Sequence, residues 1–334
     1  MTPAGPRRPS AGEAPPLRGL FLPVTTPFRE DGGISPERLL RQLEIYRGFP
    51  LSGIVLFGTS GEGPLLDPGE EPALLAASRE AVPAAWHLIV QVGRESVRAT
   101  VAAAARAEAA GATALLCLPP RYYATGPEVV AAYFRALRVE TALPILAYHI
   151  PQRSRVDLPA DLLLELAAEG TLAGVKDSAG DLALQARLRQ EAGGGFAVLN
   201  GKGSVTERAL RAGADGAILA IADAAPEPVA ALFEAHTAGD VERAERIQRA
   251  LSPLAECCGR RYGVAGIKAA LDLRGWPGGG PTRAPLAPLG EIARAEVARA
   301  LRAAGVEPAE SAAKAVGTEA ATGTATGAAA RSSV

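Results

Sequence analysis

The segment "ALLCLPPRYYATGPEVVAAYFRALRVETALPILAYHI", residues 114–150, contains the pattern that decides the fold. It begins with an apolar run (114–119) and passes through polar and small residues into a stretch with helical spacing of its apolar residues (127–140). It ends in a second apolar run (144–149). Continuous apolar runs of this length are typical of strands buried on both faces, as in parallel sheets covered by helices. The segment therefore predicts a strand–helix–strand unit.

The same alternation continues along the chain in both directions. Stretches with helical periodicity separate most of the apolar runs, and one of them opens with Ser35 as a helix cap and Pro36 in the first helical position. Eight strand–helix units favour an α/β fold of the (β/α)8 TIM-barrel type over an open doubly wound sheet. The remaining runs that predict strands are residues 19–24, 53–58, 87–92, 172–176, 196–200 and 216–220.

The domain organisation follows from where this alternation begins and ends. We expect a barrel over residues 18–238 and a C-terminal helical extension over 239–305, with helices in 240–258 and 263–275. Residues 1–17 are rich in proline, glycine and alanine, and residues 306–334 are small or polar. Neither segment has the apolar residues to build a core, so both are predicted to be disordered tails.

Composition excludes several classes of partner. The chain has 334 residues, of which 48% are hydrophobic, and a formal net charge of −1. A charge so close to zero argues against binding to nucleic acid or to an anionic membrane surface, and no apolar run is long enough to span a bilayer. The first residues lack the apolar core of a signal peptide, and the three cysteines have no metal-binding spacing. We therefore expect a cytoplasmic protein with reduced thiols.

Four polar features follow predicted strands at equivalent positions. Lys176 ends the sixth apolar run and Tyr148 ends the fifth, while "GTSGEG" (58–63) follows the second and "PPRYYATG" (119–126) follows the fourth. In a barrel of this type the chemistry lies at the C-terminal ends of the strands. The four features would meet on that face, which predicts an active site there.

Lys176 raises the sharpest question because it follows an apolar run in "LAGVKDSAG" (172–180). Lysine is rarely fully buried, since removing an ammonium from water is costly. The side chain could reach solvent, or it could pair with Asp177. At a barrel mouth beside Tyr148 we favour a third reading. Burial disfavours the ammonium, and the neutral amine can attack a carbonyl to form a Schiff base.

The glycine-rich turn and the tyrosine also have two readings each. "GTSGEG" lacks the Gly-Lys-Ser/Thr ending of a P-loop and the glycine spacing of a dinucleotide site. It is either an ordinary turn or a cradle in which backbone N–H groups and the hydroxyls of Thr59 and Ser60 bind a carboxylate. Tyr148 is either a core aromatic or a proton shuttle. Because the turn and the tyrosine are both expected beside Lys176, we favour a functional role for each of them.

Several motifs, taken in order, resemble one known family. "LPVTTPF" (22–28), "GTSGEG", "YHIPQRS" (148–154) and "GVKDSAGD" (174–181) are similar to the landmarks of the dihydrodipicolinate synthase / N-acetylneuraminate lyase family of class I Schiff-base aldolases. The resemblance covers residues 17–301. The stretch 260–286 and the form "KDSAGD" resemble the 4-hydroxy-2-oxoglutarate aldolase branch in particular.

The resemblance implies roles for individual residues around a pyruvate-type 2-oxo acid. Lys176 matches the Schiff-base lysine and Tyr148 the general acid/base. Thr59 and Ser60 match the residues that hold the carboxylate, and Thr59 would also relay protons. Ile218 matches a position whose backbone contacts the pyruvyl group.

Two further positions are implied by the synthase-type members. Tyr122 matches a relay tyrosine that one subunit lends to another across a dimer interface. Arg153 matches an arginine that binds the carboxylate of the incoming aldehyde, a task that suits its planar fork. The alternative for Arg153 is a surface arginine paired with Asp157. His149 and Arg155 depart from the synthase pattern, as does Arg121, and these departures leave the substrate open.

The function expected from the resemblance is a Schiff-base-forming lyase or aldolase, similar to dihydrodipicolinate synthase. It would act on pyruvate and an aldehyde such as aspartate semialdehyde, with no metal or organic cofactor, in a homodimer or homotetramer. A 4-hydroxy-2-oxoglutarate aldolase or another 2-oxo-acid aldolase remains an alternative, as does an inactive binding module on the same barrel. A metal-dependent aldolase would need a ligand cluster, and His87, His149 and His236 fall in unrelated segments.

Overall fold

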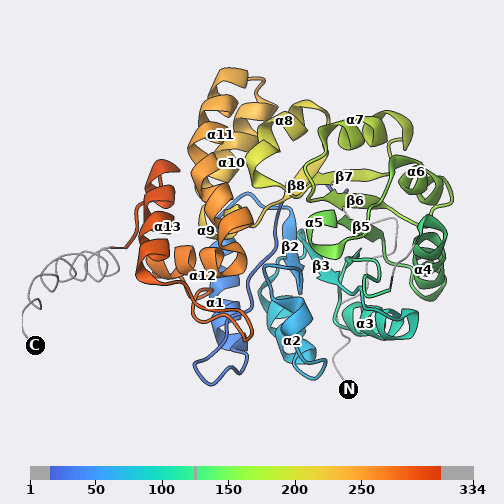
Figure 1. Ribbon diagram of the computed structural model, residues 1–334, viewed down its shortest axis with the longest axis horizontal. Helices are drawn as coiled ribbons and strands as arrows, with labels where there is room; N and C mark the ends of the chain where they lie inside the picture. Colours follow the sequence, from blue (N-terminus) through green and yellow to red (C-terminus); the bar gives the residue numbers. More distant parts are fainter. Residues whose placement is uncertain (1–15, 124–125, 310–334) are drawn as a thin grey trace, which may run out of the picture.

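A computed structural model of the protein describes residues 16–123 and 126–309, and its centre is a closed barrel of eight parallel strands (Figure 1). The strands follow one another around the barrel in chain order. The predicted (β/α)8 TIM barrel with additional C-terminal helices is therefore confirmed. The strands are β1 (Gly19–Leu22), β2 (Gly53–Leu56), β3 (His87–Gln91), β4 (Ala114–Cys117), β5 (Ile145–His149), β6 (Gly174–Asp177), β7 (Ala197–Asn200) and β8 (Gly216–Ile218).

The barrel closes where β8 pairs with β1, with Gly19 opposite Gly216 and Phe21 opposite Ile218. The two backbones approach so closely that a Cβ atom on Gly216 would lie 2.1 Å from the carbonyl oxygen of Gly19. A side chain at residue 216 would therefore force the two strands apart. The glycine that opens β8 permits the closure.

A helix follows each strand and covers the outside of the barrel (Figure 1). Proline occupies an early position in several of these helices, as at Pro36, where its missing N–H is not needed. Ser96 accepts a hydrogen bond from the Ala99 N–H at 3.2 Å and so caps α3. The helices are α1 (Pro36–Tyr46), α2 (Glu71–Ala81), α3 (Val97–Ala109), α4 (Pro127–Glu140), α5 (Pro151–Ser154), α6 (Ala160–Ala168), α7 (Leu182–Glu191), α8 (Thr206–Arg211), α9 (Ile221–Ala224), α10 (Pro226–Thr237), α11 (Val241–Ala255), α12 (Gly263–Leu273) and α13 (Glu291–Ala303).

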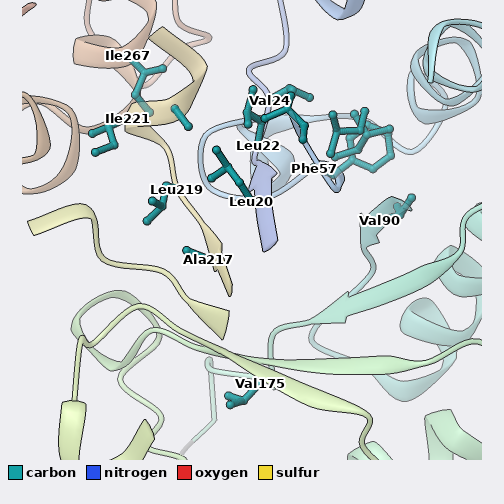
Figure 2. Packing of buried hydrophobic residues seen from close by; sticks show 14 of the residues in the cluster. Leu20, Leu22, Val24, Phe57, Val90, Val175, Ala217, Leu219, Ile221 and Ile267 are labelled. Atoms are coloured by element: carbon teal, nitrogen blue, oxygen red, sulfur yellow. The ribbon is translucent and has the colours of Figure 1, made fainter. Parts of the chain in front are cut away.

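The apolar residues form two layers, because successive strand residues face opposite sides of the sheet. One layer fills the barrel and includes Phe21, Val55, Ile89 and Leu116. The other lies between the barrel and its helices, and part of it is shown in Figure 2. The continuous apolar runs of the sequence are explained by this burial on both faces.

The C-terminal extension gathers on one side of the barrel, drawn in orange and red in Figure 1. It consists of α11, a π-helical segment (Glu256–Arg261), α12 and α13, of which the sequence analysis did not single out α13. The extension also reaches the barrel helix α1. The rings of Trp276 and Tyr46 lie 5.9 Å apart, and Arg38 donates a hydrogen bond to the Pro277 carbonyl at 2.9 Å.

Residues with packing contacts extend slightly beyond the expected domain limits at both ends. Leu17 packs against the core inside the barrel. Val306 is buried, and the Ala309 N–H donates to the Leu273 carbonyl at 2.7 Å. The remainder of the two expected tails, 1–15 and 310–334, lies outside the described residues. Within the described ranges, no helix combines the length and apolar character needed to cross a bilayer.

Candidate active site

Lys176 and Tyr148 are neighbours at the C-terminal ends of two adjacent strands. β5 and β6 pair in a register that places Tyr148 opposite Lys176. Both side chains are 4% exposed, and Lys176 Nζ lies 4.3 Å from the centre of the Tyr148 ring. The lysine therefore does not reach solvent, so the first of the simple explanations for it is wrong.

The second simple explanation, a pair between Lys176 and Asp177, is also wrong. The Asp177 carboxylate is completely buried and accepts hydrogen bonds from the Gln185 side chain at 2.7 Å and the backbone N–H groups of Ala179 and Asp181 at 3.0 and 2.9 Å. Its remaining partner is His149, at 2.9 Å. Since consecutive strand residues point to opposite faces, Lys176 enters the barrel and Asp177 faces the helices.

The Tyr148 hydroxyl lies in a polar environment that favours its ionised form. Thr59 Oγ1 is 3.1 Å away. Burial alone would favour the neutral phenol, but the positive charge of protonated Lys176 and hydrogen bonds with Thr59, Lys176 and Ser178 together lower the pKa of Tyr148. Ser178 was not predicted as a site residue, although it follows Lys176 by only two positions in "KDSAG".

The loop after β2 brings Thr59 and Ser60 to the same end of the barrel. Ser60 is 6% exposed, and the Thr26 hydroxyl donates to the Gly61 carbonyl at 2.7 Å, which fixes the turn. The loop bends sharply, with φ of 60° at Phe57 and 52° at Glu62. Its glycines leave backbone N–H groups accessible to an anion.

Ile218 completes the floor of this region. It is the last residue of β8, is 1% exposed and belongs to the same apolar cluster inside the barrel as Tyr148. The structure thus brings together Lys176, Tyr148, Thr59 and Ile218 at one end of the barrel, with Ser60 in the loop beside them.

A cavity of about 540 Å³ opens at this end of the barrel, and its lining includes two of these residues but not Lys176, Ser60 or Ile218. Thr59 and Tyr148 lie in its wall, together with Gln91, which the sequence analysis did not select. Charged and apolar side chains form the rest of the lining, which includes Glu62, and the C-terminal extension contributes to it. The rim residues include Arg121, Arg153, Arg260, Arg261, Leu118, Ile150, Tyr262 and Val264. A small anionic molecule with a short carbon chain fits this lining.

Arg153 lies on α5, directly after β5, and its side chain has no acidic partner among the described residues. The predicted alternative partner, Asp157, instead binds His149 Nε2 at 2.9 Å. The reading of Arg153 as half of a pair with Asp157 is therefore wrong. A Cβ on Gly263 would lie 3.5 Å from the Arg153 guanidinium, so the arginine lies beside the start of α12.

Tyr122 does not reach the cavity of its own chain. It is 81% exposed in the loop after β4, with its ring 5.1 Å from that of Tyr123. Its backbone N–H donates to Glu95 at 3.0 Å, which anchors this part of the loop. Residues 124 and 125 of the "PPRYYATG" motif lie outside the described residues.

His149 supports the two strands from behind the candidate catalytic pair. Its ring nitrogens lie 2.9 Å from carboxylate oxygens of Asp177 and Asp157, and the ring is 3% exposed. Burial would favour the neutral ring, but the two carboxylates outweigh it and raise the pKa of His149. The shift favours the imidazolium, in which both nitrogens donate, and the ring joins β5 and β6 to the loop after α5.

One buried acid near the site has no partner for its side chain among the described residues. Asp223 on α9 is 0% exposed, and neither carboxylate oxygen accepts a hydrogen bond. Burial raises the pKa of Asp223 well above its usual value, although the charge of Lys176 opposes the shift. This environment favours the neutral acid. Its position in the apolar stretch "GAILAIADAAP" was a signal that the sequence analysis did not use.

Comparison with known proteins gives one consistent result. A model of the family described as "Dihydrodipicolinate synthetase family" matches residues 16–304. An uncharacterised DapA-like lyase of Halobacterium salinarum is 33% identical over 287 residues, which cover 86% of this chain and 94% of that protein. The 4-hydroxy-tetrahydrodipicolinate synthase of Moorella thermoacetica is 31% identical over 287 residues, with coverage of 86% and 98%.

Solved structures agree with these relatives. The dihydrodipicolinate synthase of Thermotoga maritima superposes with a TM-score of 0.82 at 26% identity, covering 86% of this chain and 98% of that one. A monomeric dihydrodipicolinate synthase variant gives the same TM-score and identity, with coverage of 87% and 97%.

Proposed function

The chain belongs to the dihydrodipicolinate synthetase family, whose members are lyases of the Schiff-base aldolase type, and from that premise we propose the following reaction. The protein forms a Schiff base between Lys176 and a pyruvate-type 2-oxo acid and joins the resulting enamine to an aldehyde. The observation that carries the proposal is the buried Lys176 amine, 4.3 Å from the ring of Tyr148, whose hydroxyl lies 3.1 Å from Thr59.

The lysine supplies the covalent step. The neutral amine of Lys176 attacks C2 of the 2-oxo acid, and loss of water gives an imine. The imine withdraws electrons, so a proton leaves C3 and an enamine forms. C3 of the enamine then attacks the aldehyde carbon, and water hydrolyses the new imine to release the product and the amine. The same steps in reverse cleave a 4-hydroxy-2-oxo acid.

The surrounding residues bind the substrate and move its protons. Thr59, Ser60 and the backbone N–H groups of their loop hold the carboxylate of the 2-oxo acid, while the Ile218 backbone contacts the pyruvyl group. Tyr148 exchanges protons with the amine and with the hydroxyl that leaves as water. Its lowered pKa suits this task, because a phenol that ionises more easily gives up its proton at a lower cost.

Arg153 binds the aldehyde partner. A guanidinium at the cavity rim with no acidic partner in the described chain favours a carboxylated aldehyde, as in a dihydrodipicolinate synthase acting on aspartate semialdehyde. A second candidate is a 4-hydroxy-2-oxoglutarate aldolase, whose substrate also carries a second carboxylate. The stretch 260–286, which resembles that branch and contributes Arg260, Arg261 and Tyr262 to the cavity lining, favours it.

The proposal includes an assembly and a compartment. Tyr122 would act in the cavity of a second copy of the chain, because its exposed position leaves it free to enter a neighbouring subunit. A homodimer or a homotetramer in the cytoplasm provides this arrangement. The reaction as written needs no metal or organic cofactor, since the lysine itself is the electron sink.

Borohydride trapping tests the reaction class directly. The protein incubated with pyruvate and borohydride should gain the mass of one reduced pyruvate adduct per chain, located on Lys176 by peptide mapping. Lys176→Ala should fold and gain none. An adduct on another lysine would refute the assignment, and the absence of any adduct in the wild type would refute the proposed function. Turnover of pyruvate with aspartate semialdehyde, against cleavage of 4-hydroxy-2-oxoglutarate, then separates the two candidate substrates.

A further inference from the structure

Lysine is rare in this chain, which has four lysines and 31 arginines. Of the three lysines in the described residues, Lys176 and Lys268 are buried, with exposures of 4% and 1%. Lys176 has a place in the proposed reaction. Lys268 lies on α12, outside the barrel, and its burial requires a different explanation.

Groups that complement a positive charge enclose the Lys268 ammonium. Its Nζ lies 2.6 Å from Glu62 Oε1, and both side chains are almost completely inaccessible to solvent. It also donates a hydrogen bond to the Pro281 carbonyl at 2.7 Å and lies 4.3 Å from the centre of the Phe28 ring. Burial lowers the pKa of Lys268, and the Glu62 carboxylate opposes that shift. Removal of either partner would leave an uncompensated charge in the interior.

Glu62 belongs to the loop 57–63, whose backbone is held in an unfavourable conformation. Phe57 and Glu62 have φ of 60° and 52°, a region that residues other than glycine rarely occupy. The turn is also too tight for a side chain at Gly63, where a Cβ would lie 1.8 Å from the Phe57 carbonyl oxygen. Such a conformation persists only where its surroundings hold it.

The C-terminal extension provides those surroundings. Lys268 contacts one oxygen of the Glu62 carboxylate, and the Arg283 backbone N–H donates to the other at 2.8 Å. The Arg283 guanidinium donates at 2.9 Å to the carbonyl of Leu65, in the turn that follows this loop, and at 2.7 Å to the carbonyl of Gly32, in the loop between β1 and α1. The loop is therefore held at its acidic end by residues more than 200 positions away.

Thr59 and Ser60 lie between the two strained positions of this loop. Thr59 Oγ1 is 3.1 Å from the Tyr148 hydroxyl, so a small shift of the loop would change this distance. We propose that Lys268 is a positioning residue, whose ion pair with Glu62 fixes the loop that presents Thr59 and Ser60 to the carboxylate of the 2-oxo acid. This inference rests on the function proposed above.

Two single variants and their combination test it. In Glu62→Gln and in Lys268→Met, the pyruvate concentration that gives half-maximal borohydride trapping on Lys176 should rise by about tenfold to a hundredfold, the effect of a misplaced binding group. The extent of trapping at saturating pyruvate should stay that of the wild type, since the amine is untouched. The double variant should show no larger rise than the single variants, because both residues act through one contact.

A matched control separates positioning from a general loss of stability. Asp215 also has a carboxylate with little exposure, 7% for its side chain, but it lies at the opposite end of the barrel, just before β8. There it accepts a hydrogen bond from the Val198 N–H at 2.9 Å and pairs with Arg189 at 3.4 Å. Asp215→Asn should lower the urea midpoint of unfolding and leave the half-maximal pyruvate concentration unchanged.

The outcomes are distinct. If the wild type traps no pyruvate, the proposed function fails and the positioning role falls with it. If the wild type traps pyruvate and both single variants do so at the same half-maximal concentration, the positioning role alone is overturned. An equal rise in Asp215→Asn would overturn it as well. Should Lys268→Met fail to fold, Glu62→Gln, which keeps the shape of the side chain, decides the question alone.

Discussion

Tyr148 and Tyr133 are both buried tyrosines with hydrogen-bonded hydroxyl groups, but only Tyr148 lines the cavity. The Tyr148 hydroxyl lies near Thr59 Oγ1, whereas the Tyr133 hydroxyl lies 2.6 Å from Thr100 Oγ1 on the helical side of the sheet. The two residues therefore form a matched pair for testing which hydroxyl serves chemistry and which serves packing.

Tyr148→Phe should slow turnover by roughly 10²–10⁴-fold, the usual effect of removing a positioned proton-transfer group. Tyr133→Phe should leave turnover near wild type and lower the free energy of unfolding by about 1 kcal/mol, the net value of a hydrogen bond. Steady-state kinetics and urea titration of both variants check these expectations. If Tyr148→Phe turns over at the wild-type rate, Tyr148 serves only in packing the core.

The variant Arg153→Ala tests whether the Arg153 side chain binds the aldehyde substrate. Trapping of pyruvate on Lys176 should be unaffected, because Arg153 lies at the rim of the cavity. For a carboxylated aldehyde, kcat/KM should fall by the value of a charge-assisted contact, about 2–5 kcal/mol. An uncharged aldehyde serves as the control and should lose far less. Equal losses for both aldehydes, or no loss for either, would rule out an acidic partner bound by Arg153.

The sequence could indicate which residues gather at the site but not always what each one contacts. Lys176 and Tyr148 were predictable neighbours because each ends an apolar run and the carboxyl ends of parallel strands meet at one edge. The partner of Asp157 was not predictable, since Arg153 and His149 are both close to it in the sequence and the geometry of α5 decides between them. Gln91 and Asp223 gave no motif, and only burial and the fold bring them near Lys176 and Tyr148.

At the scale of elements, the imidazolium of His149 joins two strands and a loop. It bonds Asp177 on β6 and Asp157 after α5, and these two carboxylates raise the pKa of His149 above its ordinary value. When folding raises the pKa of a group, the group stabilises the folded state fully at any pH below its pKa in the unfolded chain. This stabilisation is lost as the pH rises through the pKa of the group in the folded protein.

The stability of the wild type relative to His149→Gln should therefore decline as the pH rises from about 6.5, the ordinary pKa of histidine, through the raised pKa of the folded protein. Urea unfolding of both proteins across this range measures the difference. His236, on α10 and away from the site, supplies the control, since His236→Gln should leave the decline in place. A difference between the wild type and His149→Gln that is independent of pH would mean that folding leaves the pKa of His149 unchanged, which would contradict the two ion pairs as its cause.

The sequence predicts whether a segment is a strand or a helix better than it predicts where that element begins and ends. Each apolar run contains a strand, but β8 spans only Gly216–Ile218, because the chain turns into α9 soon after the ladder with β1 ends. Helix α13 was missed because alanine fills many of its positions, which weakens the contrast between its buried and exposed faces. The short helices α5 and α9 were also beyond prediction, as four residues carry no periodicity.

At the scale of the whole molecule, the proposed role of Tyr122, which is exposed on its own chain, makes each active site a structure shared between two copies of the chain. If each copy lends Tyr122 to its neighbour, Tyr122→Ala and Lys176→Ala should each be inactive alone. A mixed dimer contains one complete site, formed by Lys176 of one subunit and Tyr122 of the other. Co-refolding the two variants in equal amounts should restore about a quarter of wild-type activity, because half of the dimers are mixed and each has one working site.

Activity of the mixture relative to the separate variants measures this complementation. No recovery in a mixture that forms dimers would place Tyr122 outside the reaction. Recovery beyond about half of wild type would mean that one of the two variants was never inactivated by its substitution.

The chain has few lysines, and two of them have buried amines that lie over aromatic rings. The NMR spectrum of its lysine side chains should therefore be simple. Labelling lysine alone with ¹³C yields ε-methylene resonances from only four side chains. Lys176 lies over the Tyr148 ring and Lys268 over the Phe28 ring, each 4.3 Å from the ring centre, so the circulating π electrons shift their resonances away from that of a solvated lysine. The reacting amine and the amine that holds its neighbouring loop can then be followed separately in one spectrum as a 2-oxo acid is titrated.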